Sequence, residues 1–254
     1  MKSIKYNEFD QKVVFVTGAA SGIGAAQAEA FLEQGANVFA FDQQEGTMET
    51  LSRQFTKRFV SFLGDVRNKG DLEKAVAQCH DTFGAIDILL PTAGILDGYV
   101  PLMETSEELF DKIFEVNVKS TFNLSKLVLP NMLSRQSGVI IPMTSIAGMV
   151  AGGGGVAYTM SKHAIAGFIK QVALDYADQG IRVNGIAPGA IDTPMNAADF
   201  AGEGEMAKKV AEDTPVKRWA KPEEVAALTL FLASEHASYL QGTIIPIDGG
   251  WTIK

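Results

Sequence analysis

The chain has little of the chemistry that forms disulfides or binds metals. Its single cysteine, Cys79, excludes an internal disulfide and a thiolate metal site, so a reducing compartment fits. The three histidines, His80, His163 and His236, are scattered without the spacing of metal ligands. We therefore predict no metal site and assign these four side chains to helix packing or to the surface.

Basic residues and long apolar runs are also scarce. The chain has 22 lysines and arginines against 30 aspartates and glutamates, a net charge of −8. Nucleic acids and anionic membranes attract basic patches, so neither is expected as a partner. No run approaches the roughly 18 apolar residues of a membrane-spanning helix, and the first ten residues lack an apolar signal core. We expect a cytoplasmic protein.

Short apolar runs alternate with longer helical stretches along the whole chain. The expected strands are residues 12–17, 37–41, 59–63, 86–90, 138–143, 182–186 and 243–247, and the expected helices are 23–34, 71–82, 106–133, 157–179 and 222–233. Several of these strands are continuously apolar, which is typical of a parallel sheet covered on both faces. With no linker or repeat, residues 1–254 are predicted to form one α/β domain, a doubly wound parallel seven-stranded sheet with helices on both faces.

A glycine-rich turn follows the first expected strand directly. Residues 17–24 have the spacing Gly-x-x-x-Gly-x-Gly, and a helix is expected to begin there. Glycines allow a tight turn and a close approach of the main chain to a pyrophosphate, which the free N–H groups of the helix N-terminus can bind. As a bare pattern it could be a structural turn, but its position favours dinucleotide binding. The expected contacts are Gly18, Ser21, Gly22, Ile23 and Gly24.

Acidic residues end the next two expected strands. At the end of the second strand, Asp42 can accept hydrogen bonds from both hydroxyls of an adenosine ribose, unless it is only a solvated strand end. It would repel a 2′-phosphate, and the next basic residue is Arg53, so we expect NAD rather than NADP. Asp65 and Val66 stand where the sheet edge would meet the adenine, although Asp65 could instead cap a helix.

Tyr158 and Lys162 are one helical turn apart, so both side chains leave the same face of the expected helix. A nearby ammonium group favours the phenolate and lowers the phenol pKa towards the working range. The pair is therefore a candidate general acid/base, although this spacing alone occurs often by chance.

Together these motifs resemble the short-chain dehydrogenase/reductase family from Val13 to Gly250, and within it the 3-oxoacyl-acyl-carrier-protein reductases and related bacterial alcohol dehydrogenases. Residues 17–24 reproduce the family's glycine turn. The resemblance implies a Rossmann fold. It assigns the catalytic roles to Asn117, Ser145, Tyr158 and Lys162, and it adds Ala93, Gly94, Tyr158, Lys162, Pro188, Gly189 and Thr193 to the cofactor contacts.

One segment departs from the family pattern. Pro91 and Thr92 stand where the family often has two asparagines, the second of which ties neighbouring strands together. The following Ala93 and Gly94, which allow close approach of the main chain, are kept. We expect a structural variation in which Thr92 ties the strands less well, rather than lost cofactor binding.

The resemblance implies hydride transfer between a nicotinamide and a carbinol or carbonyl carbon. Tyr158 would move the proton, Ser145 would donate to the substrate oxygen, and Lys162 would lower the Tyr158 pKa and bind the nicotinamide ribose. Asn117 would hold a water for proton relay. The expected substrate is a small neutral hydroxy-ketone, diol or sugar alcohol.

Two other functions stay open. An NADPH-dependent 3-oxoacyl-acyl-carrier-protein reductase is disfavoured by Asp42 and by the net charge of −8, which suits an acidic carrier protein poorly. A non-catalytic NAD-binding sensor would give no reason for an intact Ser145, Tyr158 and Lys162.

Residues 188–215 interrupt the alternation of strands and helices and are expected to form a lid or a flexible insertion. Family resemblance further implies a homotetramer or homodimer.

Overall fold

The computed structural model describes residues 4–254, so the predicted domain of residues 1–254 and the first ten residues discussed above lie partly outside the described chain. The strands are β1 (Val13–Thr17), β2 (Asn37–Asp42), β3 (Phe59–Leu63), β4 (Ile88–Pro91), β5 (Gly138–Ile140), β6 (Ile181–Val183), β7 (Gly185–Pro188) and β8 (Ile244–Ile247). The α-helices are α1 (Gly22–Glu33), α2 (Met48–Gln54), α3 (Lys69–Phe83), α4 (Glu107–Phe114), α5 (Ser120–Arg135), α6 (Val156–Tyr176), α7 (Glu205–Asp213) and α8 (Pro222–Ala233).

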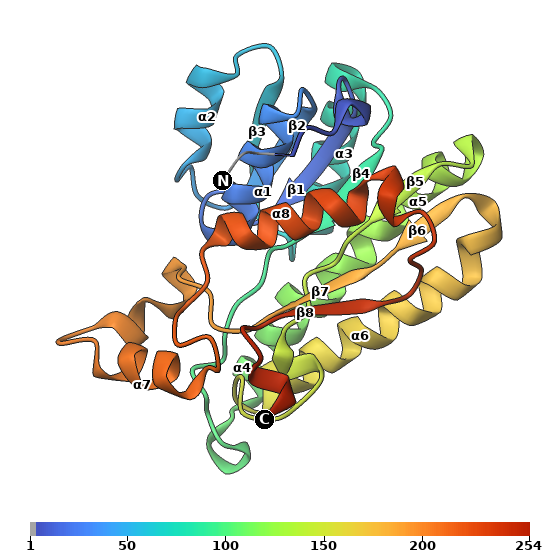
Figure 1. Cartoon of the computed structure of the whole chain (residues 1–254). Coiled ribbons are helices and arrows are strands. Elements are labelled where there is room, and N and C mark those ends of the chain that lie inside the picture. Colours follow the sequence, from blue (N-terminus) through green and yellow to red (C-terminus); the bar gives the residue numbers. More distant parts are fainter. Residues whose placement is uncertain (1–3) are drawn as a thin grey trace.

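Six parallel strands form the main sheet in the order β3-β2-β1-β4-β5-β6 (Figure 1). The chain runs outward from β1 to β3 and then returns to the other side of β1 with β4. This reversal separates the loops after β1 and β4 at the carboxyl edge of the sheet, where open α/β sheets bind their ligands. The doubly wound parallel architecture is as predicted.

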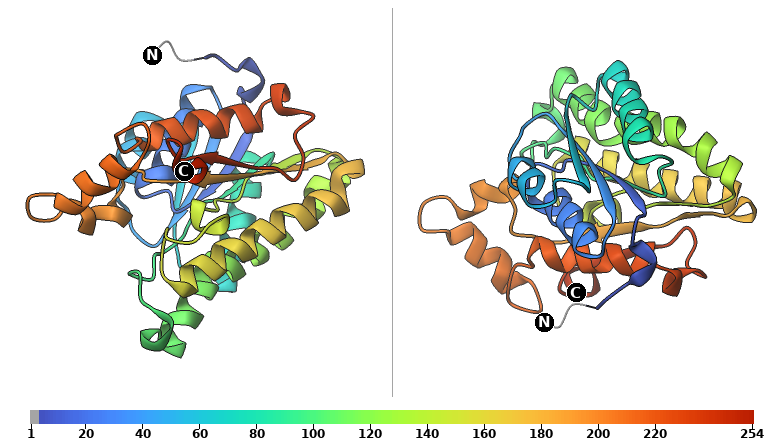
Figure 2. Two further views of the ribbon diagram at one scale, coloured as in Figure 1. Left: turned by 60° about the horizontal axis from the view of Figure 1, so that its bottom comes forward. Right: turned by 90° about the horizontal axis from the view of Figure 1, so that it is seen from above.

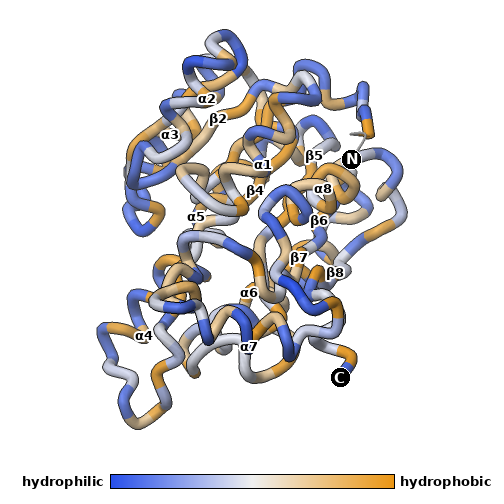
Figure 3. The backbone as a smooth tube through the Cα atoms, turned by 60° about the vertical axis from the view of Figure 1, so that its left-hand side comes forward, coloured by the Kyte–Doolittle hydropathy of each residue, from blue (hydrophilic) through white to orange (hydrophobic). Residues whose placement is uncertain are grey.

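Helices cover both faces of the sheet, with α1 and α8 on one side and α3, α5 and α6 on the other (Figure 2). The central strands β1 and β4 are wholly buried, and Val14, Phe15 and Val16 of β1 are 0% exposed, whereas the edge strand β3 is partly exposed. Figure 3 shows the same pattern, with hydrophobic colour along the central strands and hydrophilic colour at the outer turns. Burial on both faces explains why β1 reads as a continuous apolar run.

The prediction of one seven-stranded sheet is wrong at the carboxyl-terminal side. The strand expected at 182–186 is divided at Asn184 into β6, which pairs with β5, and β7, which pairs with β8 in a separate two-stranded sheet. The Asn184 side chain donates to the Leu240 carbonyl (2.8 Å) and accepts from the Thr243 N–H (3.1 Å). These bonds hold the segment that precedes β8 at the point where the expected strand divides. A single bridge between Met143 and Ile186 still links the two sheets.

The helix expected over 106–133 contains a defect that hydrophobic spacing does not reveal. It consists of α4, a π-helical turn over Glu115–Lys119 and then α5, which continues past Pro130 to Arg135. Pro130 therefore does not end the helix. The π-turn contains Asn117, and π-turns of this kind are frequent at functional sites.

The expected lid is more ordered than its composition indicated. Residues 188–215 include a 3-10 segment over Pro194–Phe200 and the helix α7, and they project from the body of the sheet (Figure 1). Trp219 donates its indole N–H to the Ala207 carbonyl of α7 at 2.9 Å, and its ring packs on Phe200. Neither α7 nor α2 was predicted, because both are short and polar.

Candidate active site

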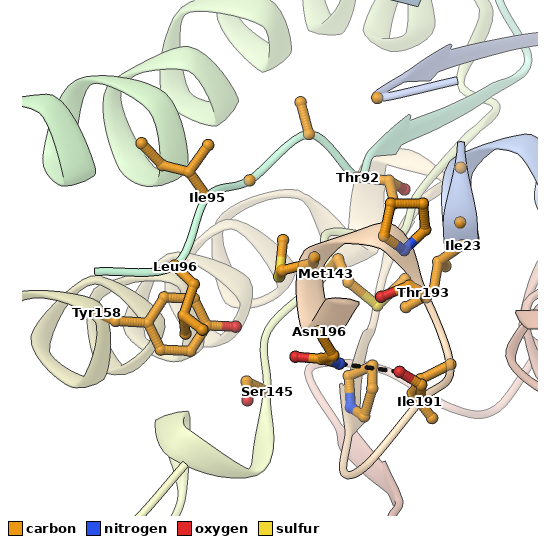
Figure 4. Close-up of a pocket in the computed structure, with 18 of the residues that line it drawn as sticks. Ile23, Thr92, Ile95, Leu96, Met143, Ser145, Tyr158, Ile191, Thr193 and Asn196 are labelled. Carbon is orange, nitrogen blue, oxygen red and sulfur yellow. Dashed lines mark hydrogen bonds between the residues drawn. The ribbon is translucent and has the colours of Figure 1, made fainter. Parts of the chain in front are cut away.

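A cavity of about 510 Å³ opens at the carboxyl ends of β1, β2, β4 and β7 (Figure 4). It is lined by nearly all of the predicted site residues: Gly18, Ser21, Gly22, Ile23, Gly24, Asp42, Asp65, Val66, Ala93, Gly94, Ser145, Tyr158, Lys162, Pro188, Gly189 and Thr193. The remaining one, Asn117, lies behind the wall, with its Oδ1 3.3 Å from the position of a Cβ built on Gly94. The sheet topology thus brings together residues from almost the whole chain.

The glycine turn passes tightly between β1 and α1. Gly18 has φ +71°, and a Cβ there would lie 2.9 Å from the Cα of Ala93. Gly22 has φ +53° and begins α1, and Gly22, Ile23 and Gly24 of its first turn all line the cavity. A side chain at Gly18 would be strained and would fill the gap against Ala93, which fits a turn built for close approach of a pyrophosphate.

The second strand ends at the same cavity with a carboxylate already bonded to the turn. Asp42 accepts from the Ala20 N–H through Oδ2 and from the Gln44 N–H through Oδ1, both at 3.0 Å. It therefore fixes the glycine turn to the end of β2 while lining the cavity. The interpretation of Asp42 as merely solvated does not agree with these bonds.

The neighbouring acidic residue has a different partner from either that the sequence suggested. Asp65 accepts from the guanidinium of Arg67 at 2.9 and 2.6 Å, and the side-chain hydrogen bond from Arg67 lowers the Asp65 pKa. The N-cap of α3 is Asn68, so the expectation that Asp65 could cap the helix is wrong. Arg67 itself lines the cavity, and the sequence did not reveal it as a nearby cation because it follows β3 and not β2, the strand that ends at Asp42.

Thr92 makes a tie of its own where the family often has asparagine. The N–H groups of Thr92 and Ala93 both donate to Thr17 Oγ1 of β1 at 3.1 Å. The Thr92 hydroxyl donates to Gln27 Oε1 of α1 at 2.6 Å, and Gln27 Nε2 donates to Thr229 Oγ1 of α8 at 2.9 Å. This buried chain of hydrogen bonds joins the β4 loop to two helices. The side chain of Thr92 thus reaches α1 and not a neighbouring strand, and the expectation that it ties the strands less well than asparagine stays a prediction.

Ser145, Tyr158 and Lys162 meet at the other end of the cavity. Ser145 caps the short 3-10 turn over Ile146–Gly148 by accepting from the Ala147 N–H at 3.1 Å. Tyr158 and Lys162 lie on the first two turns of α6, and Lys162 Nζ is 5.4 Å from the centroid of the Tyr158 ring. Lys162 Nζ also donates to the Met143 carbonyl at 3.0 Å. All three side chains are buried.

Burial dominates the electrostatics of this group. It raises the pKa of Tyr158 to about 12, against an opposing hydrogen bond with Ser145 and with smaller upward contributions from Tyr99 and Asp97. Burial also lowers the pKa of Lys162 to about 8. The predicted lowering of the Tyr158 pKa is therefore wrong for this structure, because desolvation of the phenolate outweighs the ammonium group.

Asn117 connects the loop after β4 to the helix that carries the pair. Its Oδ1 accepts from the Ile95 N–H at 2.8 Å, and its Nδ2 donates to the Ile95 carbonyl (3.0 Å) and to Ser161 Oγ (3.1 Å). The π-turn directs this side chain inward between the two segments. The bonds make Asn117 a brace behind the cavity, and its relay of protons through a water stays a prediction.

Several further residues that line the cavity carried no signal in the sequence. Around Tyr158 the wall includes Ile95, Leu96, Tyr99, Met195, Asn196, Asp199 and Trp219. Figure 4 shows Leu96 and Tyr158 among the residues that line the cavity, and Asn196 donating to the Ile191 carbonyl, a bond of 2.8 Å. The charge of Asp199 raises the pKa of the Tyr99 phenol, after burial, so these two lie near each other. These residues add apolar surface and one carboxylate to the lining of the cavity.

Within residues 4–254, no group of three or more histidine, cysteine, aspartate or glutamate side chains is arranged to bind a metal ion. Among the same residues, no helix has the length and apolarity needed to cross a bilayer.

Comparison with known proteins identifies the family. A family model described as enoyl-(acyl carrier protein) reductase matches residues 18–252. The chain is 37% identical to 3beta-hydroxysteroid dehydrogenase 2 of Eggerthella lenta, with 93% of each chain covered. It is 39% identical to the NAD-dependent glycerol dehydrogenase of Listeria innocua, with 96% of this chain and 94% of that protein covered. The chain belongs to the short-chain dehydrogenase/reductase family.

A solved structure agrees with this family assignment. The short-chain dehydrogenase/reductase fold seen here superposes on a Beutenbergia cavernae protein described as a candidate NAD(P)-dependent gluconate 5-dehydrogenase, crystallised with NADP at low occupancy. The TM-score is 0.89 at 31% identity, covering 96% of this chain and 98% of that one. The chain is accordingly an oxidoreductase that uses a nicotinamide cofactor and acts on CH–OH groups or the corresponding ketones.

Proposed function

We propose that this short-chain dehydrogenase/reductase transfers a hydride between NAD and a neutral secondary alcohol or ketone, with Tyr158 as general acid/base. The observation that carries the proposal is the convergence of Ser145, Tyr158 and Lys162 at one end of a cavity whose other end is lined by the glycine turn and Asp42. A protein that only bound the dinucleotide would need the second end and not the first.

The residues of the chain fit a nicotinamide dinucleotide. The turn at Gly18 leaves open the space that a Cβ would fill, and Asp42 stands beside it at the end of β2. Bound there, the cofactor would supply the acceptor or donor of the hydride. Lys162 Nζ, directed at the Met143 carbonyl and close to Gly94, is placed to bind a ribose hydroxyl between these two segments.

The proton chemistry falls to Tyr158 and Ser145. Tyr158 Oη takes the proton of the substrate hydroxyl in oxidation and returns it to the substrate oxygen in reduction. Ser145 Oγ, whose interaction with the Tyr158 phenol opposes the rise of the phenol pKa, is positioned to donate to the same oxygen as charge develops on it. The high pKa of Tyr158 favours the protonated phenol, which is the form that reduction requires.

NAD is proposed over NADP because of the charges around the adenosine end. Asp42 would repel a 2′-phosphate, and Arg67, the cation on the same wall, is paired with Asp65 at 2.6 Å. The glycerol dehydrogenase described above is named as NAD-dependent, whereas the Beutenbergia cavernae protein was crystallised with NADP, so the preference rests on these side chains.

The substrate is proposed to be a neutral hydroxy-ketone or diol. Ile95, Leu96 and Met195 favour an apolar body, while Asp199 disfavours a carboxylate or an acidic carrier protein near Tyr158. The 3-oxoacyl-acyl-carrier-protein reductase activity stays the alternative and is included in the test below.

A substrate panel tests the proposal. Glycerol and other polyols, a hydroxysteroid, a hydroxy acid and a 3-oxoacyl thioester are each assayed with NAD(H) and NADP(H) by the absorbance of the reduced nicotinamide. We expect turnover of a neutral substrate with NAD, lost in Tyr158→Phe. Turnover of the thioester with NADPH alone would support the reductase alternative. Cofactor binding with no turnover of any substrate, unaltered in Tyr158→Phe, would support a sensor.

The assembly is proposed to be a homodimer or homotetramer formed by the long helices. Ile165 and Ile169 of α6 pack in the chain's own core and are therefore not available for a shared face. Outward-facing apolar area remains at Phe122 of α5 and Leu174 of α6, which are 51% and 76% exposed. Light scattering on the purified chain should give a mass of two or four copies. A cytoplasmic location stays a prediction.

A further inference from the structure

Asp97 is a buried carboxylate to which the mechanism proposed above assigns no role. It lies in the loop after β4, between Leu96 and Tyr99 on the cavity wall, and is 3% exposed. A carboxylate so deeply buried is costly unless hydrogen bonds compensate it. Its partners therefore indicate what it does.

All three hydrogen bonds to Asp97 come from main-chain N–H groups, and two belong to the start of α6. Oδ1 accepts from Gly155 at 2.8 Å and from Tyr99 at 3.1 Å, and Oδ2 accepts from the Tyr158 N–H at 2.9 Å. Gly155 is the N-cap of α6 and brings no side chain to satisfy the first turn. Asp97 supplies the missing acceptor from a distant part of the chain, and its charge suits the positive end of the helix dipole.

The close approach depends on glycine at position 155. A Cβ there would lie 2.6 Å from Asp97 Oδ2 and 2.6 Å from the Val100 carbonyl oxygen. The backbone of Gly155 has φ −75°, which any residue can adopt, so the space and not the conformation requires glycine. The loop after β4 and the first turn of α6 are thus fitted to each other around this carboxylate.

We propose that Asp97 is a positioning residue for the reaction, holding the first turn of α6, and with it Tyr158, against the loop that walls the substrate end of the cavity. The inference rests on the proposed role of Tyr158. It extends that role, because the same bonds place Leu96 and Tyr99 relative to the phenol.

The charge of Asp97 gives the proposal a signature that a merely structural contact would not have. The groups that face the Tyr158 phenol are Ser145, Lys162, Tyr99 and Asp97, with Asp199 beyond Tyr99. Among them Asp97 acts to raise the Tyr158 pKa. Removing its charge should therefore move the ionisation of Tyr158 to lower pH.

The test compares Asp97→Asn with Asp87→Asn. Asp87 is a matched control because it also accepts from a main-chain N–H, that of Val13 at 3.0 Å, and pairs with Arg135 at 2.8 Å. It lies at the amino end of the sheet, away from the cavity. Each variant is assayed for kcat, KM, NAD affinity and the pH dependence of alcohol oxidation.

We expect Asp97→Asn to lower kcat about 10- to 100-fold with NAD affinity unchanged, because the amide presents a donor to one of the three N–H groups and displaces Tyr158. The acid limb of its pH profile should move to lower pH. Asp87→Asn should lose thermal stability while keeping the kcat and the pH profile of the unmodified chain. If Asp97→Asn has the same kcat and the same pH profile as Asp87→Asn, the proposal is overturned.

Two further measurements keep the inference testable by itself. If no panel substrate is turned over, the proposed function fails, but phenolate absorbance, taken as the difference from Tyr158→Phe, still reports the Tyr158 ionisation. An unchanged ionisation in Asp97→Asn would refute the inference. If Asp97→Asn does not fold, Gly155→Ala keeps the carboxylate and separates it from α6, and an unaltered kcat in that variant would refute the inference equally.

Discussion

The link from Thr92 through Gln27 to Thr229 makes a quantitative prediction about stability. Gln27 is 0% exposed, and its Oε1 accepts from Thr92 Oγ1 at 2.6 Å. Thr92→Val removes this donor at nearly constant volume and leaves a buried carbonyl oxygen without it. An unsatisfied buried acceptor costs about 1–3 kcal/mol, so we expect the free energy of unfolding to fall by about 2 kcal/mol. For a chain of this length Tm should then fall by roughly 4–8 °C.

A double-mutant cycle separates this cost from other effects of the substitution. In a Gln27→Met background there is no amide oxygen to leave unpaired, so Thr92→Val should cost close to nothing there. Thr229 keeps an acceptor in both backgrounds, because its hydroxyl donates to the Val225 carbonyl at 2.9 Å. The four chains are compared by chemical denaturation and by their affinity for NAD.

The affinity for NAD should not change in this series, since the N–H groups of Thr92 and Ala93 remain bonded to Thr17 Oγ1. A Thr92→Val chain as stable as the unmodified one would show that the chain of hydrogen bonds carries no net energy. An equal decrease in the free energy of unfolding in both backgrounds would show that the decrease does not come from the unpaired carbonyl oxygen of Gln27. Either result contradicts the reasoning.

Three other substitutions test the site. Tyr158→Phe should lower kcat about 10²- to 10⁴-fold with NAD affinity kept, and activity near that of the unmodified chain would exclude the phenol as acid/base. Asp42→Asn should lower the KM for NADP and raise that for NAD, whereas an NADP preference of the unmodified chain would refute the Asp42 argument. Lys162→Met should abolish activity yet raise the free energy of unfolding at pH 7, because burial lowers the folded-state pKa of Lys162 from 10.5 to about 8. Unfolded chains therefore hold this proton more readily, so the gain should be complete below pH 8 and disappear as pH approaches 10.5, which denaturation at several pH values would check.

The predictable parts of the site are those whose chemistry lies within a few residues. The glycine spacing after β1, Asp42 at the end of β2, and the Tyr158 and Lys162 pair one turn apart are all local patterns. The alternation of apolar runs and helical stretches likewise sufficed for the doubly wound sheet, because burial on both faces leaves a readable signal in each strand. All of these predicted residues line the cavity.

What the sequence did not show are contacts between residues far apart in the chain. Asp97 meets α6 across 58 and 61 residues, and Gln27 meets Thr229 across 202. The direction of the Tyr158 pKa shift also came from burial, which a sequence does not display.

The sequence by itself therefore determined the fold class and the family and indicated the side chains proposed to react, since these depend on periodicity and short spacings. Only the tertiary structure decided how those side chains are held and charged: the division of the sheet at Asn184, the pairing of Arg67 with Asp65 and the clamp of Asp97 on α6. The physical reason is that hydrogen-bond satisfaction and desolvation are properties of a packed environment. They are set by neighbours that folding brings together and not by neighbours along the chain.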